Sequence, residues 1–481
     1  MVSDLKSKTI HGVAWSFVER FSVQAIQFIL GIILARLLSP NDYGLIAMLV
    51  VFISISQVFI DGGFSSALVQ RQYRSEMDFS TAFYTNLGIS IICYLLLFIF
   101  APIIASFYHQ PLLISITRIY SINLILNSLV AIHKVKLIIS VDFKTQSKIS
   151  FTSALISGII GIICAYVGYG VWALIIQALF LALFNVLLSF YYVRWLPILN
   201  FSISSFKSLF SFGSKLLIAS LISNVYTNLY ALVIGKKFSS SSLGMYSRAD
   251  QFAQFTSSNI ANILARVSFP VLSQIQNDNE RLISVYRRYI QISALLVFPL
   301  ILGLCGIAKP LILLLLTEKW SGCIILLQIL CFSYLWNCVV TVNLNLLNVK
   351  GRSDLVLKLE IIKKVIAFLI LIISLSFDLI GICIGLVVYS LIALYLNTYY
   401  TKKILNYGFK KQFVELLPYL LLSLLIMCEA LFFSHFISSY LLSIILSIII
   451  CSLTYIVLCY YFRLSAFTEL VSLLWFKQKF R

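Results

Sequence analysis

Hydrophobic positions along the chain form long runs of about twenty residues, separated by short segments rich in polar, charged, Gly and Pro residues. A helix needs a run of this length to cross the hydrocarbon core of a bilayer. No connection is long enough to be a separate domain. The pattern therefore predicts an all-α polytopic membrane protein with about fourteen transmembrane helices, centred near residues 23, 55, 92, 125, 157, 182, 220, 257, 294, 335, 366, 390, 424 and 450.

Polar residues inside several of these runs recur every three or four positions, which places them on one face of a helix. Unsatisfied polar groups are costly in hydrocarbon, so such polar stripes favour a water-filled cavity. Hydrogen bonding between helices is the alternative for any single residue. The stripes are Ser16, Arg20, Gln24, Gln27 and Gly31 in the first run; Ser54, Gln57, Asp61 and Ser65 in the second; Gly213, Ser220, Asn224 and Thr227 in the seventh; Gln251, Gln254, Ser258, Asn262 and Arg266 in the eighth; and Asn337, Thr341, Asn345 and Asn348 in the tenth.

A weak internal repeat relates the two halves of the chain. The segment from Gly12 to SPNDYG, which ends at Gly44, is echoed about 200 residues later by Gly213 and KKFSSSSLG, which ends at Gly244. Farther along, an offset of 210 pairs Asn127 with Asn337 and Lys148 with Lys358.

This offset contains six predicted spans, an even number, so both halves enter the membrane in the same sense. Parallel repeats of this kind are related by an axis along the membrane normal. We expect an N-terminal six-helix lobe at 1–200, a C-terminal six-helix lobe at 201–405, and two additional transmembrane helices with a cytoplasmic tail at 406–481. Spans one, two, seven and eight should line a central cavity.

Composition and charge support a membrane protein and set its orientation. Hydrophobic residues make up 61% of the chain and charged residues 11%, too little polarity to cover soluble domains. Of the 36 Lys and Arg residues, 26 fall in the two tails and the loops after even-numbered spans, and five in the loops on the opposite side. By the positive-inside rule both termini are cytoplasmic. The net charge of +19 therefore indicates topology and contact with anionic membrane lipids, not nucleic acid.

Signals of enzymes and metal sites are missing from the sequence. The ten cysteines lack CxxC or Cys/His ligand spacing, and the four histidines lie far apart, more as interfacial or satisfied side chains than as catalysts. There is no Gly-rich phosphate loop and no HExxH or DxD motif. We therefore expect no enzyme, no catalytic residue, no metal and no cofactor.

Charged residues inside the spans are candidates for function, because a charge at mid-bilayer costs at least ~2.5–3.5 kcal/mol. Basic groups outnumber acidic ones there, which suits an anionic substrate. Alternatives stay open: Arg20 could pair with Asp61, and Arg266 could extend to the inner surface. Lys215 lies off the stripe of its helix. The candidate cations are Arg20, Arg248, Arg266, Arg118 and Lys215, and the candidate ion-coupling acids are Glu19 and Asp61.

Several segments resemble the polysaccharide-transport, Wzx-type flippases, and within them the colanic-acid exporter branch. The strings that carry the resemblance are ILARLLSPNDYGLIAM (33–48), DGGFSSALVQR (61–71), SLFSFGSKLL (208–217), IGKKFSSSSLGMYSRA (234–249), RVSFPVLSQIQ (266–276) and NVKGRSDLVLKLEIIKK (348–364). The resemblance covers about residues 8–405. It implies the fold of the multidrug/oligosaccharidyl-lipid/polysaccharide exporter superfamily, two six-helix lobes around a central cavity, and location in the inner membrane of a bacterium.

The resemblance also implies a substrate, undecaprenyl-diphosphate-linked oligosaccharide moved from the cytoplasmic to the periplasmic leaflet by alternating access. Its diphosphate needs cations, and its sugars need amide and hydroxyl partners. A proton or sodium ion as coupling ion, and a polysaccharide polymerase and export machinery as partners, are compatible with this function. An ion-coupled exporter of small solutes is the main rival, and a membrane glycan polymerase or ligase is disfavoured by the lack of a long external loop. The expected sugar contacts, chosen by helical phase, are Gln24, Gln27, Gln57, Asn224, Gln251, Gln254 and Asn262.

Overall fold

The computed structural model describes residues 22–479, except for the side chains of Asn262 and residues 473–479. Throughout this described range the regular secondary structure is helical, which confirms the all-α class. Contacts within the chain divide it into two compact units, Met1–Gly244 and Met245–Arg481. This boundary lies at the start of a helix that follows the predicted seventh span. The predicted lobes at 1–200 and 201–405 rest on sequence repetition and stay a proposal.

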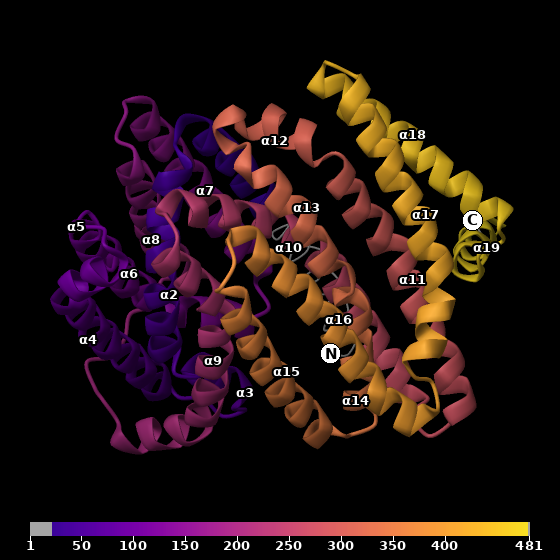
Figure 1. The fold of residues 1–481 in the computed structure, drawn as a ribbon. Helices are drawn as coiled ribbons and strands as arrows, with labels where there is room; N and C mark the ends of the chain where they lie inside the picture. Colours follow the sequence, from indigo (N-terminus) through magenta and orange to yellow (C-terminus); the bar gives the residue numbers. More distant parts are fainter. Residues whose placement is uncertain (1–21, 480–481) are drawn as a thin grey trace. The chain divides into compact units, whose positions relative to one another are not determined.

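Helices of the first unit pack both with neighbours in sequence and with helices far along the chain. Helix α7 packs along α8, α4 along α6, and α2 along both α4 and α9 (Figure 1). The helices are residues Ser22–Leu37, α2 (Pro40–Asp61), α3 (Phe64–Gln70), α4 (Glu76–Tyr108), α5 (Leu113–Tyr120), α6 (Ile122–Ile139), α7 (Phe143–Tyr166), α8 (Val171–Val193) and α9 (Ile203–Lys237).

In the second unit α11 packs along α17, α13 along α16, α15 along α16, and α17 along α18 (Figure 1). Helix α10 begins in the last residues of the first unit and continues into the second. The helices are α10 (Ser240–Gln274), α11 (Asn279–Gly306), α12 (Ala308–Leu316), the 3₁₀ turn η1 (Glu318–Trp320), α13 (Gly322–Leu335), α14 (Asn337–Val349), α15 (Ser353–Ser374), α16 (Leu379–Leu405), α17 (Phe409–Phe436), α18 (Tyr440–Tyr461) and α19 (Ser465–Lys479).

Local sequence explains where two of the long helices begin. Helix α2 starts with a capping box, in which the Asp42 carboxylate accepts from the Ser39 backbone N–H at 2.9 Å and the Ser39 hydroxyl accepts from the Asp42 N–H at 3.3 Å. Pro40 follows at the first helical position, where its missing N–H costs nothing. Ser75 and Asp78 form the same box at the start of α4. Both helices are therefore fixed at one end by neighbouring side chains.

Eleven helical segments among the described residues are long and apolar enough to cross a membrane. The protein is thus a multi-pass membrane protein, as predicted. The first expected span is described only from residue 22, as a shorter apolar helix. Helices α10 and α15 are the other two expected spans outside this set. Their composition explains why, since α10 carries a polar stripe and α15 carries Lys358, Glu360, Lys363 and Lys364.

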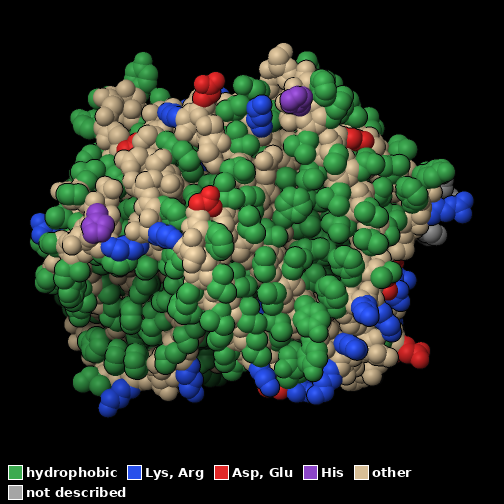
Figure 2. All heavy atoms as spheres, in the orientation of Figure 1, with side chains coloured by type: hydrophobic (Ala, Val, Ile, Leu, Met, Phe, Trp, Pro, Cys, Tyr) green, Lys and Arg blue, Asp and Glu red, His purple; other side chains and the backbone are tan. Residues whose placement is uncertain are grey.

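The surface of the second unit fits a membrane environment. On the right of Figure 2, hydrophobic side chains cover the middle of this unit, and Lys and Arg side chains gather at its lower end. Large apolar side chains of α18 are exposed, including Ile449 and Leu453 at 51% and 58%. Such a surface can contact the hydrocarbon of a bilayer, whereas a soluble protein rarely exposes so large an apolar area to water.

Two buried polar residues at the repeat offset of 210 have similar roles. His133 of α6 and Asn343 of α14 are both 0% exposed. The His133 ring Nε2 lies 3.2 Å from the Trp195 carbonyl oxygen, just after α8. Asn343 hydrogen bonds to Gln412, whose Nε2 donates to the Tyr407 carbonyl oxygen, just after α16, at 3.2 Å. His133 is a satisfied side chain, as the sequence indicated.

Candidate substrate-binding site

The polar stripe of the first span lies partly outside the described residues. Glu19 and Arg20 fall before residue 22, so their candidate roles stay predictions. Gln24 is half-buried and Gln27 is exposed on the helix 22–37.

The predicted stripes of the second and seventh spans meet inside the first unit, where α2 packs along α9. The Asn228 side-chain amide donates to the Ser54 hydroxyl at 3.1 Å and to the Asn224 Oδ1 at 2.9 Å. Asn224 is half-buried. The bond to Ser54 joins α9 to α2, and the bond to Asn224 lies within α9. Hydrogen bonding between helices is the alternative that the sequence left open for single residues.

Farther along α2, Gln57 is half-buried and Asp61 is exposed. The Ser65 hydroxyl donates to the Asp61 carboxylate at 2.6 Å. The carboxylate is therefore already hydrogen-bonded locally, next to the left-handed Gly62 that ends α2.

Helix α10 brings two predicted substrate contacts together. The Arg248 Nη1 donates to the Gln251 Oε1 at 2.6 Å, and Gln254 is exposed one turn farther along. On the same helix, Asp250 accepts from the Tyr334 hydroxyl of α13 at 2.8 Å. This part of α10 therefore carries a guanidinium, two amides and a carboxylate within two turns.

Three other predicted cations have surroundings that the structure describes. The Arg118 guanidinium lies 4.5 Å from the centre of the Phe98 ring, and its Nε donates to the Phe98 carbonyl oxygen at 3.4 Å. Lys215 of α9 and Arg266 of α10 are exposed. The Asn262 side chain lies outside the described residues.

The two repeated loops contact each other, in a reciprocal way that the sequence did not predict. Gly44 lies against the backbone of Ser240, and Gly244 lies against the backbone of Pro40. Both pairs are related by the repeat offset of 200. The Ser240 hydroxyl also donates to the Asn41 side-chain oxygen. The starts of α2 and α10 therefore cross in backbone contact, which small residues allow in membrane helices.

Alanine at Gly44 or Gly244 should separate these two helix ends, because a Cβ at either position would overlap the facing backbone. We expect at least a severalfold loss of folded protein in detergent extracts, measured by size-exclusion chromatography. Gly88→Ala is the matched control, since Gly88 lies within α4 with open space around it. There alanine should stabilise the helix by roughly 0.5–1 kcal/mol. Equal yields of all three variants would contradict the crossing.

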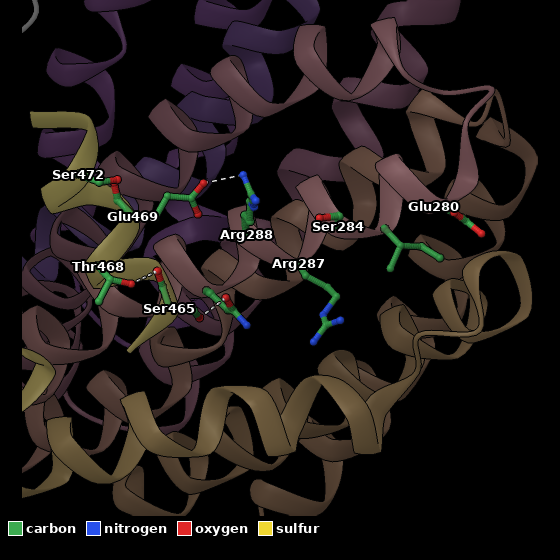
Figure 3. A pocket seen from close by; sticks show the side chains of 10 residues that line it. Glu280, Ser284, Arg287, Arg288, Ser465, Thr468, Glu469 and Ser472 are labelled. Atoms are coloured by element: carbon green, nitrogen blue, oxygen red, sulfur yellow. Dashed lines mark hydrogen bonds and ion pairs between the residues drawn. The ribbon is translucent and has the colours of Figure 1, made fainter. Parts of the chain in front are cut away.

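The pocket in Figure 3 lies in the second unit, between the start of α11 and α19, and has a volume of about 660 Å³. Its two arginines are already paired. Arg288 Nη1 lies 2.6 Å from the Glu469 carboxylate, and Arg287 Nη2 lies 2.6 Å from that of Glu415. The Ser465 hydroxyl donates to the Gln291 Oε1 at 2.9 Å. The Arg288 and Ser465 contacts hold α19 on α11, and the Arg287 contact joins α11 to α17. The compensated charges give no reason to assign an anion site.

The sequence did not predict the buried hydrogen-bonded cluster around Asn343, which we call the Asn343 hub. The Tyr286 hydroxyl and the Thr401 hydroxyl donate to its Oδ1 at 2.7 and 2.8 Å. The polar stripe expected on this helix includes Asn345, whose amide donates to the Ala265 carbonyl at 3.2 Å. The sequence held one signal for this cluster: Asn343 is an amide in an apolar span but off the polar stripe. Such a side chain must find hydrogen-bond partners inside the protein.

Comparison with known proteins identifies the family. A family model described as "Polysaccharide biosynthesis protein" matches residues 33–325, more than half of the chain. The chain belongs to this polysaccharide biosynthesis protein family. The resemblance inferred from the short strings is thereby confirmed.

Relatives and a solved structure extend this assignment. This family member is 26% identical over 437 residues to the lipopolysaccharide biosynthesis protein WzxC of Escherichia coli. The match covers 89% of this chain and 88% of WzxC. It is 27% identical to the succinoglycan biosynthesis transport protein ExoT of Rhizobium meliloti, covering 67% and 65%. Its fold is similar to that of the lipid II flippase MurJ in an inward closed conformation, with a TM-score of 0.73, 17% identity and coverage of 94% and 99%. The protein is a membrane transporter of polysaccharide biosynthesis and not an enzyme.

Proposed function

We propose that this protein moves undecaprenyl-diphosphate-linked oligosaccharide repeat units from the cytoplasmic to the outer leaflet of a bacterial inner membrane, by alternating access. The observation that carries the proposal is the similarity to WzxC over nearly the whole chain. The product is a surface polysaccharide, such as an O-antigen, a capsule or an exopolysaccharide. A polymerase and export machinery would act on the delivered unit.

The chemistry of the described polar residues supports this substrate. Arg248 offers a guanidinium, which binds phosphate oxygens in a bidentate way. Gln251, Gln254 and Asn224 offer amides for sugar hydroxyls. The polyprenyl tail can stay in lipid. Arg20 and Arg266 are proposed as further phosphate contacts, and Glu19 and Asp61 as ion-coupling groups.

Loss of the gene tests the proposal in the host strain. We expect lipid-linked oligosaccharide to accumulate in the inner membrane and surface polysaccharide to disappear, with both effects reversed by a plasmid copy. Extracted lipids are analysed by mass spectrometry. Unchanged lipid-linked sugar together with raised sensitivity to toxic cations would instead support the rival function, a small-solute exporter.

The proposed topology has fourteen spans and both termini in the cytoplasm, with α10 and α15 crossing the membrane. Reporter fusions after His109, Tyr169 and Lys237 should report the outside, and fusions after Lys144, Arg281 and Arg352 the inside. The physical reason is the unequal distribution of Lys and Arg among the loops. Two or more reversed sites would rule out this topology.

A further inference from the structure

A second, smaller pocket of the second unit lies between the start of α11 and the end of α16 and shares Ile283 with the pocket in Figure 3. Its volume is about 380 Å³. Lys402 and Lys403 line it, and both side chains are exposed. Neither ammonium group forms an ion pair or a hydrogen bond within the described part of the chain. Unlike the paired arginines of the larger pocket, these two lysines present uncompensated positive charge.

The rim of the smaller pocket adds further positive charge. The Lys350 ammonium donates to the Asn279 Oδ1 at 2.8 Å, and the Lys411 ammonium donates to the Asn406 carbonyl oxygen at 3.0 Å. Both asparagines line the pocket. Positive charge is therefore in excess here, which favours an anionic ligand. Two acids flank Asn279 in sequence: Asp278, which caps α11, and Glu280, which lines the larger pocket.

An exposed apolar face of α16 leads directly to the lysines. Its side chains, which we call the α16 stripe, are Ile384, Val388, Leu391, Tyr395 and Tyr399, each 45–55% exposed. They recur every three or four positions and therefore share one face of the helix. Lys402 and Lys403 follow three and four positions after the last tyrosine, so they continue this face. Membrane proteins place tyrosines at the level of the lipid headgroups. This end of α16 therefore matches the boundary between hydrocarbon and headgroups.

We propose that the smaller pocket binds the headgroup of an anionic phospholipid, with an acyl chain of that lipid along the α16 stripe. The lysines supply charged hydrogen bonds to phosphate oxygens. The Asn279 side chain, whose oxygen accepts from Lys350, keeps its N–H groups as further donors. A bound lipid would join the end of α16 to the start of α11.

The chemistry of the site favours an anionic phospholipid over other phosphate compounds. A water-soluble phosphate could not use the α16 stripe. A zwitterionic lipid would bring its own cation among the lysines, whereas phosphatidylglycerol and cardiolipin carry none. In the proposed topology this end of α16 is cytoplasmic, and basic pockets between transmembrane helices on that side suit such headgroups.

Native mass spectrometry of the delipidated full-length protein measures the headgroup preference. Phosphatidylglycerol should bind severalfold tighter than phosphatidylcholine with the same acyl chains. The double variant Lys402→Gln with Lys403→Gln should bind phosphatidylglycerol about 25-fold more weakly, because each lysine near an anionic headgroup contributes about fivefold. The matched control is Lys148→Gln with Lys358→Gln, which removes two exposed lysines that line neither pocket. It should bind as the wild type does.

Three results would overturn the proposal. An equal loss of binding in the control variant would show nonspecific attraction to surface charge. Competition by glycerol phosphate as effective as that by the lipid would show a site for free anions. Tighter binding of undecaprenyl phosphate than of phosphatidylglycerol would assign the pocket to the transported lipid.

Photo-crosslinking in nanodiscs tests the path of the acyl chain in the wild-type protein. Phosphatidylglycerol with a photoactivatable group in one acyl chain is added to an excess of phosphatidylcholine, and the crosslinked residues are mapped by mass spectrometry. Crosslinks should concentrate on residues 384–399. Helix α18 reports ordinary contact with bulk lipid, since Ile449 and Leu453 are similarly exposed. Equal labelling of α16 and α18 would contradict a bound lipid. Neither experiment involves transport, so its outcome is independent of the proposed function.

Discussion

Replacing Asn343 with leucine should remove most of the folded protein from the membrane. Asn343 is fully buried, and it accepts hydrogen bonds from Tyr286, Thr401 and Gln412. Leucine would leave the Tyr286 hydroxyl without its acceptor, at roughly 1–3 kcal/mol. Thr401 and Gln412 would each lose one hydrogen bond, at about 0.5–1.5 kcal/mol, while they keep the backbone carbonyls of Asn397 and Tyr407. The combined loss, on the order of 2–6 kcal/mol, is a large part of the stability of a typical protein.

The measurement is membrane abundance together with thermal unfolding in detergent. Asn348→Leu is the matched control, because Asn348 lies on the same helix and is exposed. Normal abundance and an unchanged unfolding temperature for Asn343→Leu would show that the hub does not stabilise the second unit.

Arg248→Gln should lower export about tenfold or more while leaving membrane abundance unchanged. A charged hydrogen bond to phosphate contributes about 1.5–3 kcal/mol, and each 1.4 kcal/mol corresponds to tenfold in binding. The export rate of Arg248→Lys should lie between those of the wild type and Arg248→Gln. Lysine keeps the positive charge but lacks the planar guanidinium that binds phosphate in a bidentate way. The initial rate of surface-polysaccharide synthesis after induction is the quantity to compare.

The control for charge alone is Arg281→Gln, an exposed arginine at the start of α11. It should export normally. Wild-type rates for Arg248→Gln would remove this residue from the substrate pathway. A loss of abundance would instead assign Arg248 a structural role beside Gln251.

Helical periodicity predicted the class of the fold and the existence of polar faces, but not the partners of each face. Ser54 and Asn224 lie on predicted stripes, yet only the structure shows them connected through Asn228. Asn343 was missed because the expected stripe on its helix, with Asn345, follows a different face. In a membrane protein the lipid-facing and buried faces are similarly apolar, so hydrophobicity alone does not separate them.

Repetition likewise predicted similarity but not contact. The loops ending at Gly44 and Gly244 were recognised as equivalent. Their reciprocal contact depends on how distant helices pack, which no local pattern encodes.

Leaflet exchange by purified protein tests the central claim most directly. Proteoliposomes containing undecaprenyl-diphosphate-linked oligosaccharide are treated from outside with a membrane-impermeant glycosidase, and the fraction of sugar cleaved is measured over time. We predict that about half of the sugar, the outer-leaflet share, is cleaved in protein-free vesicles, and that nearly all of it becomes accessible when the transporter is present. A protected inner-leaflet pool that persists with correctly folded protein would contradict the account.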